Sequence, residues 1–127
     1  MAETIKYSLS FQVAGGLSLP ISSEMAVDAY EKIQVAVPAG ATDMTINLQP
    51  DGAHLAAFLL IKSSAYGDSL TYKVNTSTTS IVLNGPHIFI GNGAVSILNS
   101  SPTKLLFSNA LTGDVTIDIL LGRDATP

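Results

Sequence analysis

Apolar and polar residues alternate from the start of the chain. The apolar positions of the first segment are Ile5, Tyr7, Leu9, Phe11 and Val13, and the residues between them are polar. Successive side chains of a β-strand point to opposite faces, so a period of two predicts a strand with one apolar face. We expect this face, which carries Tyr7 and Phe11, to point into the core.

The same period returns along the chain between clusters of turn residues. It recurs at 32–37, 44–48, 70–74 and 115–121, and the turns include Gly15-Gly16, Pro38-Ala39-Gly40 and Pro50-Asp51-Gly52. Residues 17–21 predict a short second strand, 22–30 at most one helical turn, and 95–98 a further strand. About eight to ten strands, with no interval long enough for a crossover helix, predict an all-β antiparallel sandwich.

One segment, from His54 to Lys62, departs from the alternation because it is apolar on both faces. Such a strand is covered on both sides. The cover comes either from the domain itself, which would make this the innermost strand, or from a neighbouring subunit. The sequence leaves both alternatives open.

The length of 127 residues suits one domain with a two-layer core. We therefore expect residues 1–127 to form a single β-sandwich domain. The last residues, 122–127, have no apolar pattern, so they are expected to be an exposed C-terminal tail.

The composition favours contacts with other proteins. Only 13% of the residues are charged while 46% are hydrophobic, and the mean hydropathy is +0.37. A monomer would have few charges to cover its outside, which indicates buried protein–protein surface and a homo-oligomer, with a trimer as one form. The net charge of −4 and the six scattered basic residues argue against nucleic acid as a partner.

The sequence also limits the compartment and the available chemistry. The absence of Cys rules out a disulfide framework and a thiolate zinc site. No basic start followed by an apolar run is present, so we expect no secretory signal. The longest apolar run, Leu55 to Ile61, is too short for a membrane helix.

No set of residues converges on a catalytic or metal site. His54 and His87 are too few for a metal centre of the cupin kind, and each is better explained as a hydrogen-bonded structural residue. Asp114 and Asp118 are expected on one strand face about 13 Å apart, too far for a glycosidase pair. Glu24, Asp28 and Glu31 form no better pair. We expect no enzyme, no bound metal and no cofactor.

Sugar binding is the remaining ligand chemistry to consider, because β-sandwiches often stack sugars on exposed aromatic rings. Most aromatic residues are in phase with apolar neighbours and are expected in the core. Tyr30 and Tyr66 lie in less regular segments. They are the two candidate stacking residues.

The order of features resembles small jelly-roll proteins that decorate or cement the capsids of tailed phages. The residues that carry the resemblance are the opening strand 5–13, the dense segment 58–64, the Leu83-Asn84-Gly85-Pro86-His87 region and the closing segment 115–124. The resemblance implies a jelly-roll-like sandwich and a non-enzymatic virion component. It also implies an oligomer that binds at junctions between major capsid subunits and assembles in the host cytoplasm.

The leading hypothesis is therefore a viral structural protein that acts as a capsid decoration or cement protein. Its contact surfaces are expected at the termini and at three polar loops, namely Gly15-Gly16, 75–79 and 99–102. The alternative is a carbohydrate- or receptor-binding β module of a virion tail or fibre that uses Tyr30 or Tyr66.

Overall fold

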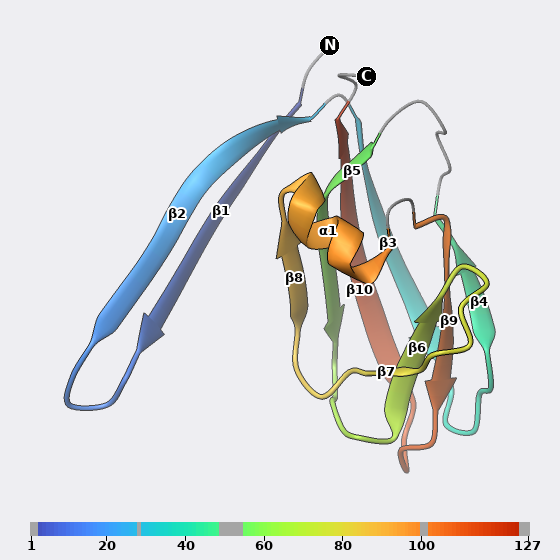
Figure 1. The fold of residues 1–127 in the computed structure, drawn as a ribbon. Helices are drawn as coiled ribbons and strands as arrows, with labels where there is room; N and C mark the ends of the chain where they lie inside the picture. The colour runs from blue at the N-terminus through green and yellow to red at the C-terminus, as the bar shows by residue number, and fades with distance from the viewer. Residues whose placement is uncertain (1–2, 28, 49–54, 100–101, 125–127) are drawn as a thin grey trace.

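The protein is an antiparallel β-sandwich from which a long β-hairpin projects (Figure 1). The computed structural model describes residues 3–27, 29–48, 55–99 and 102–124. The elements of this part are β1 (Glu3–Gln12), β2 (Ser18–Val27), β3 (Ala29–Val37), β4 (Met44–Asn47), β5 (Leu55–Ser63), β6 (Leu70–Val74), β7 (Ile81–Val82), β8 (His87–Ile90), α1 (Asn92–Leu98), β9 (Lys104–Asn109) and β10 (Val115–Asp124). The expected all-β antiparallel sandwich is confirmed.

Eight strands form the two layers of the sandwich. The first sheet has the order β3-β10-β5-β8 and the second sheet the order β4-β9-β6-β7. The pairing is nested along the chain, because β3 pairs with β10, β4 with β9, β5 with β8 and β6 with β7. Strands far apart in sequence therefore lie side by side, and the first and last strands of the sandwich, β3 and β10, form its longest pairing.

The core lies between the two sheets and follows the period of two. The first sheet contributes residues such as Leu59, Ile117 and Ile119, and the second contributes Tyr72 and Phe107, all with an exposed fraction of 1% or less. The intervening residues of each strand face outward. The alternation seen in the sequence at 70–74 and 115–121 is thus the alternation between core and outer face.

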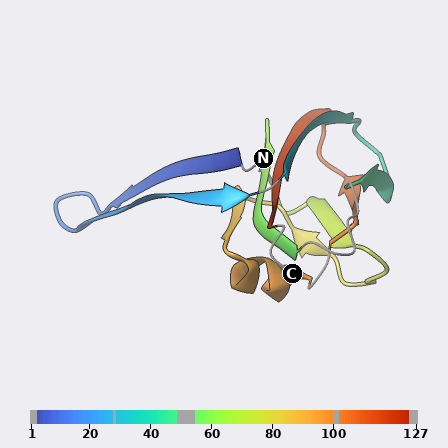
Figure 2. The same cartoon turned by 90° about the horizontal axis from the view of Figure 1, so that it is seen from above.

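The hairpin formed by β1 and β2, residues 3–27, is called the arm below. Its strands pair with each other from Glu3↔Val27 to Gln12↔Ser18 and form a two-stranded sheet of their own. Figure 2 shows from above that the arm extends away from the sandwich. The arm joins the sandwich at its base, where Ile5 and Val27 are buried against Phe58.

The segment apolar on both faces, which the sequence left open, is covered by the domain itself. β5 lies between β10 and β8 in the first sheet. Leu59 and Ile61 face the core, while Phe58 faces the base of the arm and is 4% exposed. The position of His54 lies outside the described residues.

Two predicted elements, the second strand and the segment after β8, differ from the structure. The second strand continues through Pro20 to Val27, and no helical turn separates it from β3 in the described residues. Each strand of a two-stranded ribbon has a free edge, where Pro is tolerated.

Residues 92–98 form helix α1 and not a strand. Val95 is its one buried residue and Ile97 is 84% exposed.

The expected exposed tail is also corrected for its first residues. β10 continues to Asp124, and Gly122 and Arg123 are buried. Gly122 lies where the arm crosses the sheet, since a Cβ there would approach within 2.7 Å of Ile5 Cδ1 and 3.1 Å of Val27 Cγ1. Residues 125–127 lie outside the described residues. The glycine is therefore a contact position, which an apolar pattern cannot reveal.

Candidate functional site

One of the two histidines that the sequence singled out, His87, has a hydrogen-bond partner in the structure. Nδ1 of His87 lies 2.6 Å from the hydroxyl of Tyr72, which is fully buried in the second sheet. Burial raises the pKa of the Tyr72 phenol and lowers the pKa of the His87 imidazole. Burial therefore favours the uncharged forms of both groups, and a hydrogen bond joins the Tyr72 hydroxyl to Nδ1 of the His87 ring. The expectation of a hydrogen-bonded structural histidine is confirmed for His87.

The carboxylates are held apart by the fold. Asp118 accepts a hydrogen bond from Nε2 of Gln34 at 2.9 Å, and Asp114 accepts one from the backbone N–H of Ala39 at 2.9 Å. Asp118 lies on the outer face of β10, as expected, while Asp114 precedes the strand. Among the described residues no group of three or more His, Asp or Glu could hold a metal ion.

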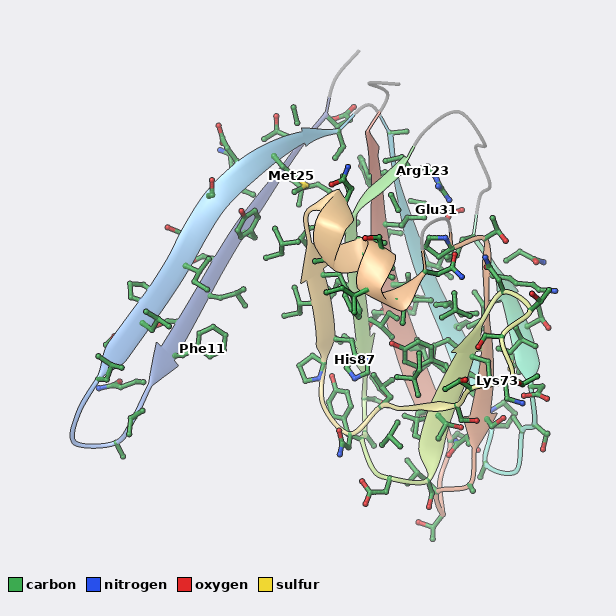
Figure 3. The ribbon with its side chains drawn as sticks, in the orientation of Figure 1. Phe11, Met25, Glu31, Lys73, His87 and Arg123 are labelled. Atoms are coloured by element: carbon green, nitrogen blue, oxygen red, sulfur yellow. The ribbon has the colours of Figure 1, made fainter. Side chains whose placement is uncertain are left out.

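The remaining acidic candidates lie on different elements. Glu24 is on the arm, opposite Lys6. Glu31 is on β3 and faces the same side as Ile33, near Arg123 on the neighbouring strand β10, as Figure 3 shows. Asp28 lies outside the described residues. The fold does not bring Glu24 and Glu31 together.

The two candidate stacking residues, Tyr30 and Tyr66, do not form one platform. Tyr30 is 57% exposed on β3 opposite Gly122, at the end of the first sheet that carries the arm. Tyr66 is 36% exposed in the loop after β5, and its hydroxyl accepts a hydrogen bond from the backbone N–H of Ser63. Ser63 pairs with Ile117, five residues from Gly122 along β10, which is about 17 Å.

Tyr66 borders a shallow depression of about 500 Å³ between its loop and the 110–114 loop. Asp114 is the charged residue of its lining, and its carboxylate already accepts the Ala39 N–H. The depression offers an aromatic ring and small polar groups.

Two of the three polar loops expected at contact surfaces lie side by side. Asn75 adopts a left-handed backbone conformation with φ 55°. Its Oδ1 accepts hydrogen bonds from the N–H and hydroxyl of Thr103 and from the N–H of Lys104, and its Nδ2 contacts Oδ1 of Asn99 at 3.3 Å. This network joins loop 75–79 to the described part of loop 99–102. The third loop, at Gly15-Gly16, is far from them, at the tip of the arm.

The arm presents the most distinctive surface of the described chain. Cross-strand partners share a face, so the pairs Leu9↔Ile21 and Phe11↔Leu19 lie on the same side, followed by Val13 and Leu17 at the tip. We call this set the arm face: Leu9, Phe11, Val13, Leu17, Leu19 and Ile21. The opposite side carries polar residues such as Ser8, Ser10, Gln12, Ser18 and Ser22. The arm is therefore an amphipathic ribbon.

The arm face becomes more exposed from base to tip. Ile5 is 9% exposed at the base, whereas Phe11 is 53% and Leu17 is 70% exposed. Figure 3 shows the ring of Phe11 on the side of the arm that faces the sandwich, with open space between them. The expectation that Phe11 belongs to the core is thus wrong. A period of two fixes which side chains share a face, but not what covers that face.

The base of the arm is anchored by a second apolar cluster. Ile5, Val27 and Phe58 are buried together, and the rings of Tyr7 and Phe58 lie 6.4 Å apart. Leu60, Ile90 and Leu120 pack around this cluster on the outer face of the first sheet. The sequence carried this signal in Phe58 and Leu60, whose side chains point away from the core between the sheets.

The outer face of the first sheet changes character below the anchor. The next row holds Gln34, Asp118 and Lys62, which are adjacent in the registers of β3, β10 and β5. Asp118 and Lys62 face each other directly across the strands. The apolar anchor is thus bounded by a polar row.

No family model, curated protein or solved structure matches this chain. Within the described residues, no helix has the length and apolar character needed to cross a membrane.

Proposed function

We propose that this protein is a non-enzymatic virion structural protein, a capsid decoration or cement protein that stabilises a shell through subunit contacts. The arm is the observation that carries the proposal. Five residues of its apolar face have exposed fractions between 44% and 70%: Phe11, Val13, Leu17, Leu19 and Ile21. An exposed apolar surface of this kind is typical of protein–protein interaction sites.

The connectivity supports the jelly-roll part of the proposal. Four nested antiparallel pairs, β3-β10, β4-β9, β5-β8 and β6-β7, are divided between two four-stranded sheets. A hairpin of four strand pairs wound into two sheets is the arrangement of a jelly roll, which is common in viral capsid proteins. The arm then is an addition before the first strand of the sandwich.

The polar chemistry of the described residues favours a structural role over an enzymatic one. His87, Asp114, Asp118 and Asn75 each have hydrogen-bond partners that fix strands or loops. A shell component of this kind would bind the major capsid protein and, as a homo-oligomer, itself. Its place would be the virion.

Co-sedimentation tests the proposal directly. The purified protein is mixed with shells assembled from the major capsid protein encoded in the same genome and centrifuged, and the bound protein is then treated with a protease. We expect saturable binding and protection of the arm tip at Gly15-Gly16. Protein that stays in the supernatant at every shell concentration would contradict the capsid role.

The alternative function, a carbohydrate- or receptor-binding module of a tail or fibre, is favoured by one observation, the depression beside Tyr66. It predicts binding on a glycan array that Tyr66→Ala abolishes. Tyr30→Ala is the matched control for that depression, because Tyr30 lies at the other end of the sheet. An array without hits would count against this function.

A further inference from the structure

The arm face is not covered by the molecule that carries it. Only its base packs on the sandwich, through Ile5 and Val27 on Phe58. Beyond the base, Phe11 and Leu19 form a cross-strand pair with exposed fractions of 53% and 56%. The missing cover must therefore come from another molecule.

The sandwich offers a poor surface for this face. Leu60 and Leu120 already pack at the arm base. Beyond them, the first sheet presents Gln34, Asp118 and Lys62, and Gln34 donates a hydrogen bond to Asp118. Pressing apolar side chains onto this row would remove two charged groups from water without new partners. The same mismatch holds for the sandwich of a second copy. Docking of the arm tip on a sandwich is therefore unfavourable.

The other strongly exposed apolar side chains of the described residues form no second surface of this extent. Tyr66, Val82 and Ile97 lie singly on different elements. Ile88 lies beside Leu60 at the arm base, and Tyr30 lies at the end of the same sheet. None forms a continuous surface that matches the arm in extent. Among the described residues, the surface that fits the arm face in size and chemistry is the arm face itself.

We propose that two copies of this protein associate by packing their arm faces against each other, apolar side to apolar side. The contact is isologous, so the same residues serve both copies. Each arm has one apolar side, and one partner covers it, so the assembly closes as a dimer and not as a trimer. This inference deepens the proposed assembly function, on which its biological meaning rests.

The area is adequate for such a contact. The five most exposed residues of the arm face, Phe11, Val13, Leu17, Leu19 and Ile21, leave on the order of 500 Å² of apolar surface in water. Two arms together would bury about 1,000 Å² before the polar rim is counted, close to the lower end of specific interfaces at about 1,200 Å². Half-buried Leu9 and the strand edges extend the contact.

Light scattering over a dilution series tests the dimer with a matched pair of variants. Leu19→Glu places a carboxylate on the arm face, and Ser18→Glu places the same charge one residue away on the polar side. We expect the wild type and Ser18→Glu to have twice the 13.2 kDa chain mass at micromolar concentrations. For Leu19→Glu we expect a dissociation constant raised about 100-fold or more, because a carboxylate would be buried without a partner.

Three outcomes would overturn the inference. One is a wild type that remains a monomer at the highest concentrations. Another is a dimer that Leu19→Glu leaves intact, which would indicate contact elsewhere. The third is an equal loss with Ser18→Glu. Circular dichroism of each variant shows whether the sandwich is folded. Since Leu19 is not packed on the sandwich, the thermal midpoint of Leu19→Glu should equal that of the wild type at concentrations where both proteins are monomers.

A thiol probe gives an independent measurement, because the chain contains no Cys. Ile21→Cys places a thiol on the arm face and Ser22→Cys places one on the polar side. Dimerisation should slow maleimide labelling of the first about tenfold or more and leave the second unchanged. Equal labelling rates at concentrations where the wild type is a dimer would overturn face-to-face packing.

Shell co-sedimentation separates this inference from the proposed function. A wild-type dimer that does not bind shells would refute the capsid role and leave the arm dimer standing. A wild-type monomer that binds shells, with binding lost in Leu19→Glu, would refute the dimer and identify a shell protein as the occupant of the arm face.

Discussion

Replacement of Phe58 by Ala should weaken the attachment of the arm to the sandwich. Phe58 is 4% exposed and lies on the outer face of the first sheet, not in the core between the sheets. Its ring is covered by Ile5 and Val27 and lies 6.4 Å from the ring of Tyr7. The truncation would leave a cavity between the two parts of the molecule.

The expected cost follows from the buried area. Removing the ring returns roughly 150 Å² of apolar contact, which at about 25 cal/mol per Å² corresponds to about 4 kcal/mol. Core replacements of Phe by Ala cost about 3–5 kcal/mol when the site does not collapse. Because the cavity lies at the arm base, we expect faster amide hydrogen exchange in β1 and β2 than the fall in global stability alone would produce.

Urea unfolding followed by circular dichroism measures the loss of unfolding free energy, and hydrogen exchange locates it. Ile97→Ala is the control, since this residue is 84% exposed and should change stability by less than about 0.5 kcal/mol. A loss below about 1 kcal/mol for Phe58→Ala, or unchanged exchange in the arm, would refute the anchor role of this residue.

Three further predictions concern the sandwich. Asn109→Ala removes the bonds from Nδ2 to the carbonyls of Val37 and Gly113 and should cost about 2–4 kcal/mol in urea unfolding. Burial lowers the pKa of His87, so as the pH falls the unfolded chain takes up this proton at a higher pH than the folded protein does. Stability should be full above about pH 6.5 and fall as the pH drops from there toward the lower folded pKa, which thermal melts in matched buffers can follow. Lys73→Ala breaks an exposed pair with Asp43 and should change the thermal midpoint by less than the error of the melt. A loss of stability for Lys73→Ala as large as that for Asn109→Ala would contradict the expectation that the buried hydrogen bonds contribute more than the exposed ion pair.

The strands that the sequence predicts well have an unbroken period of two, with one face in the core and the other face in solvent. In 115–121 the alternate residues Val115, Ile117 and Ile119 all point into the core. The opposite positions include Asp118, which hydrogen-bonds outside. Here local pattern and tertiary packing agree, and the residues of the face can be named from the sequence.

The short apolar segments were not predictable in the same way. Val95 and Leu98 are three residues apart, a spacing that suits a helix turn, while Val95 and Ile97 suit a strand. The structure buries Val95 and leaves Ile97 exposed, so the helical spacing prevails. Seven residues are too few for periodicity to separate the two. The packing of α1 beside β5 and β8 decides it.

Contacts between distant elements, such as that between the arm and the end of β10, also could not be predicted from the sequence. Gly122 has no side chain to enter an apolar pattern, yet its smallness lets Ile5 and Val27 approach β10. The pairing of arm base and sheet depends on residues more than 90 positions apart. Such a contact is set by the fold and leaves no mark in either segment alone.

The arm also helps to explain the high hydrophobic fraction of the sequence. A hydrophobic fraction of 46% with 13% charged residues would suggest an oversized core in a monomer. In the structure, much of the excess lies on the arm, where five residues from Phe11 to Ile21 are exposed by 44% or more. Because a two-stranded ribbon is marginally stable alone in water, its length beyond the anchor has to be stabilised by what it contacts. The apolar residues that leave the free arm exposed would therefore stabilise it once a second arm face covers them, and the order of the arm tip should depend on protein concentration.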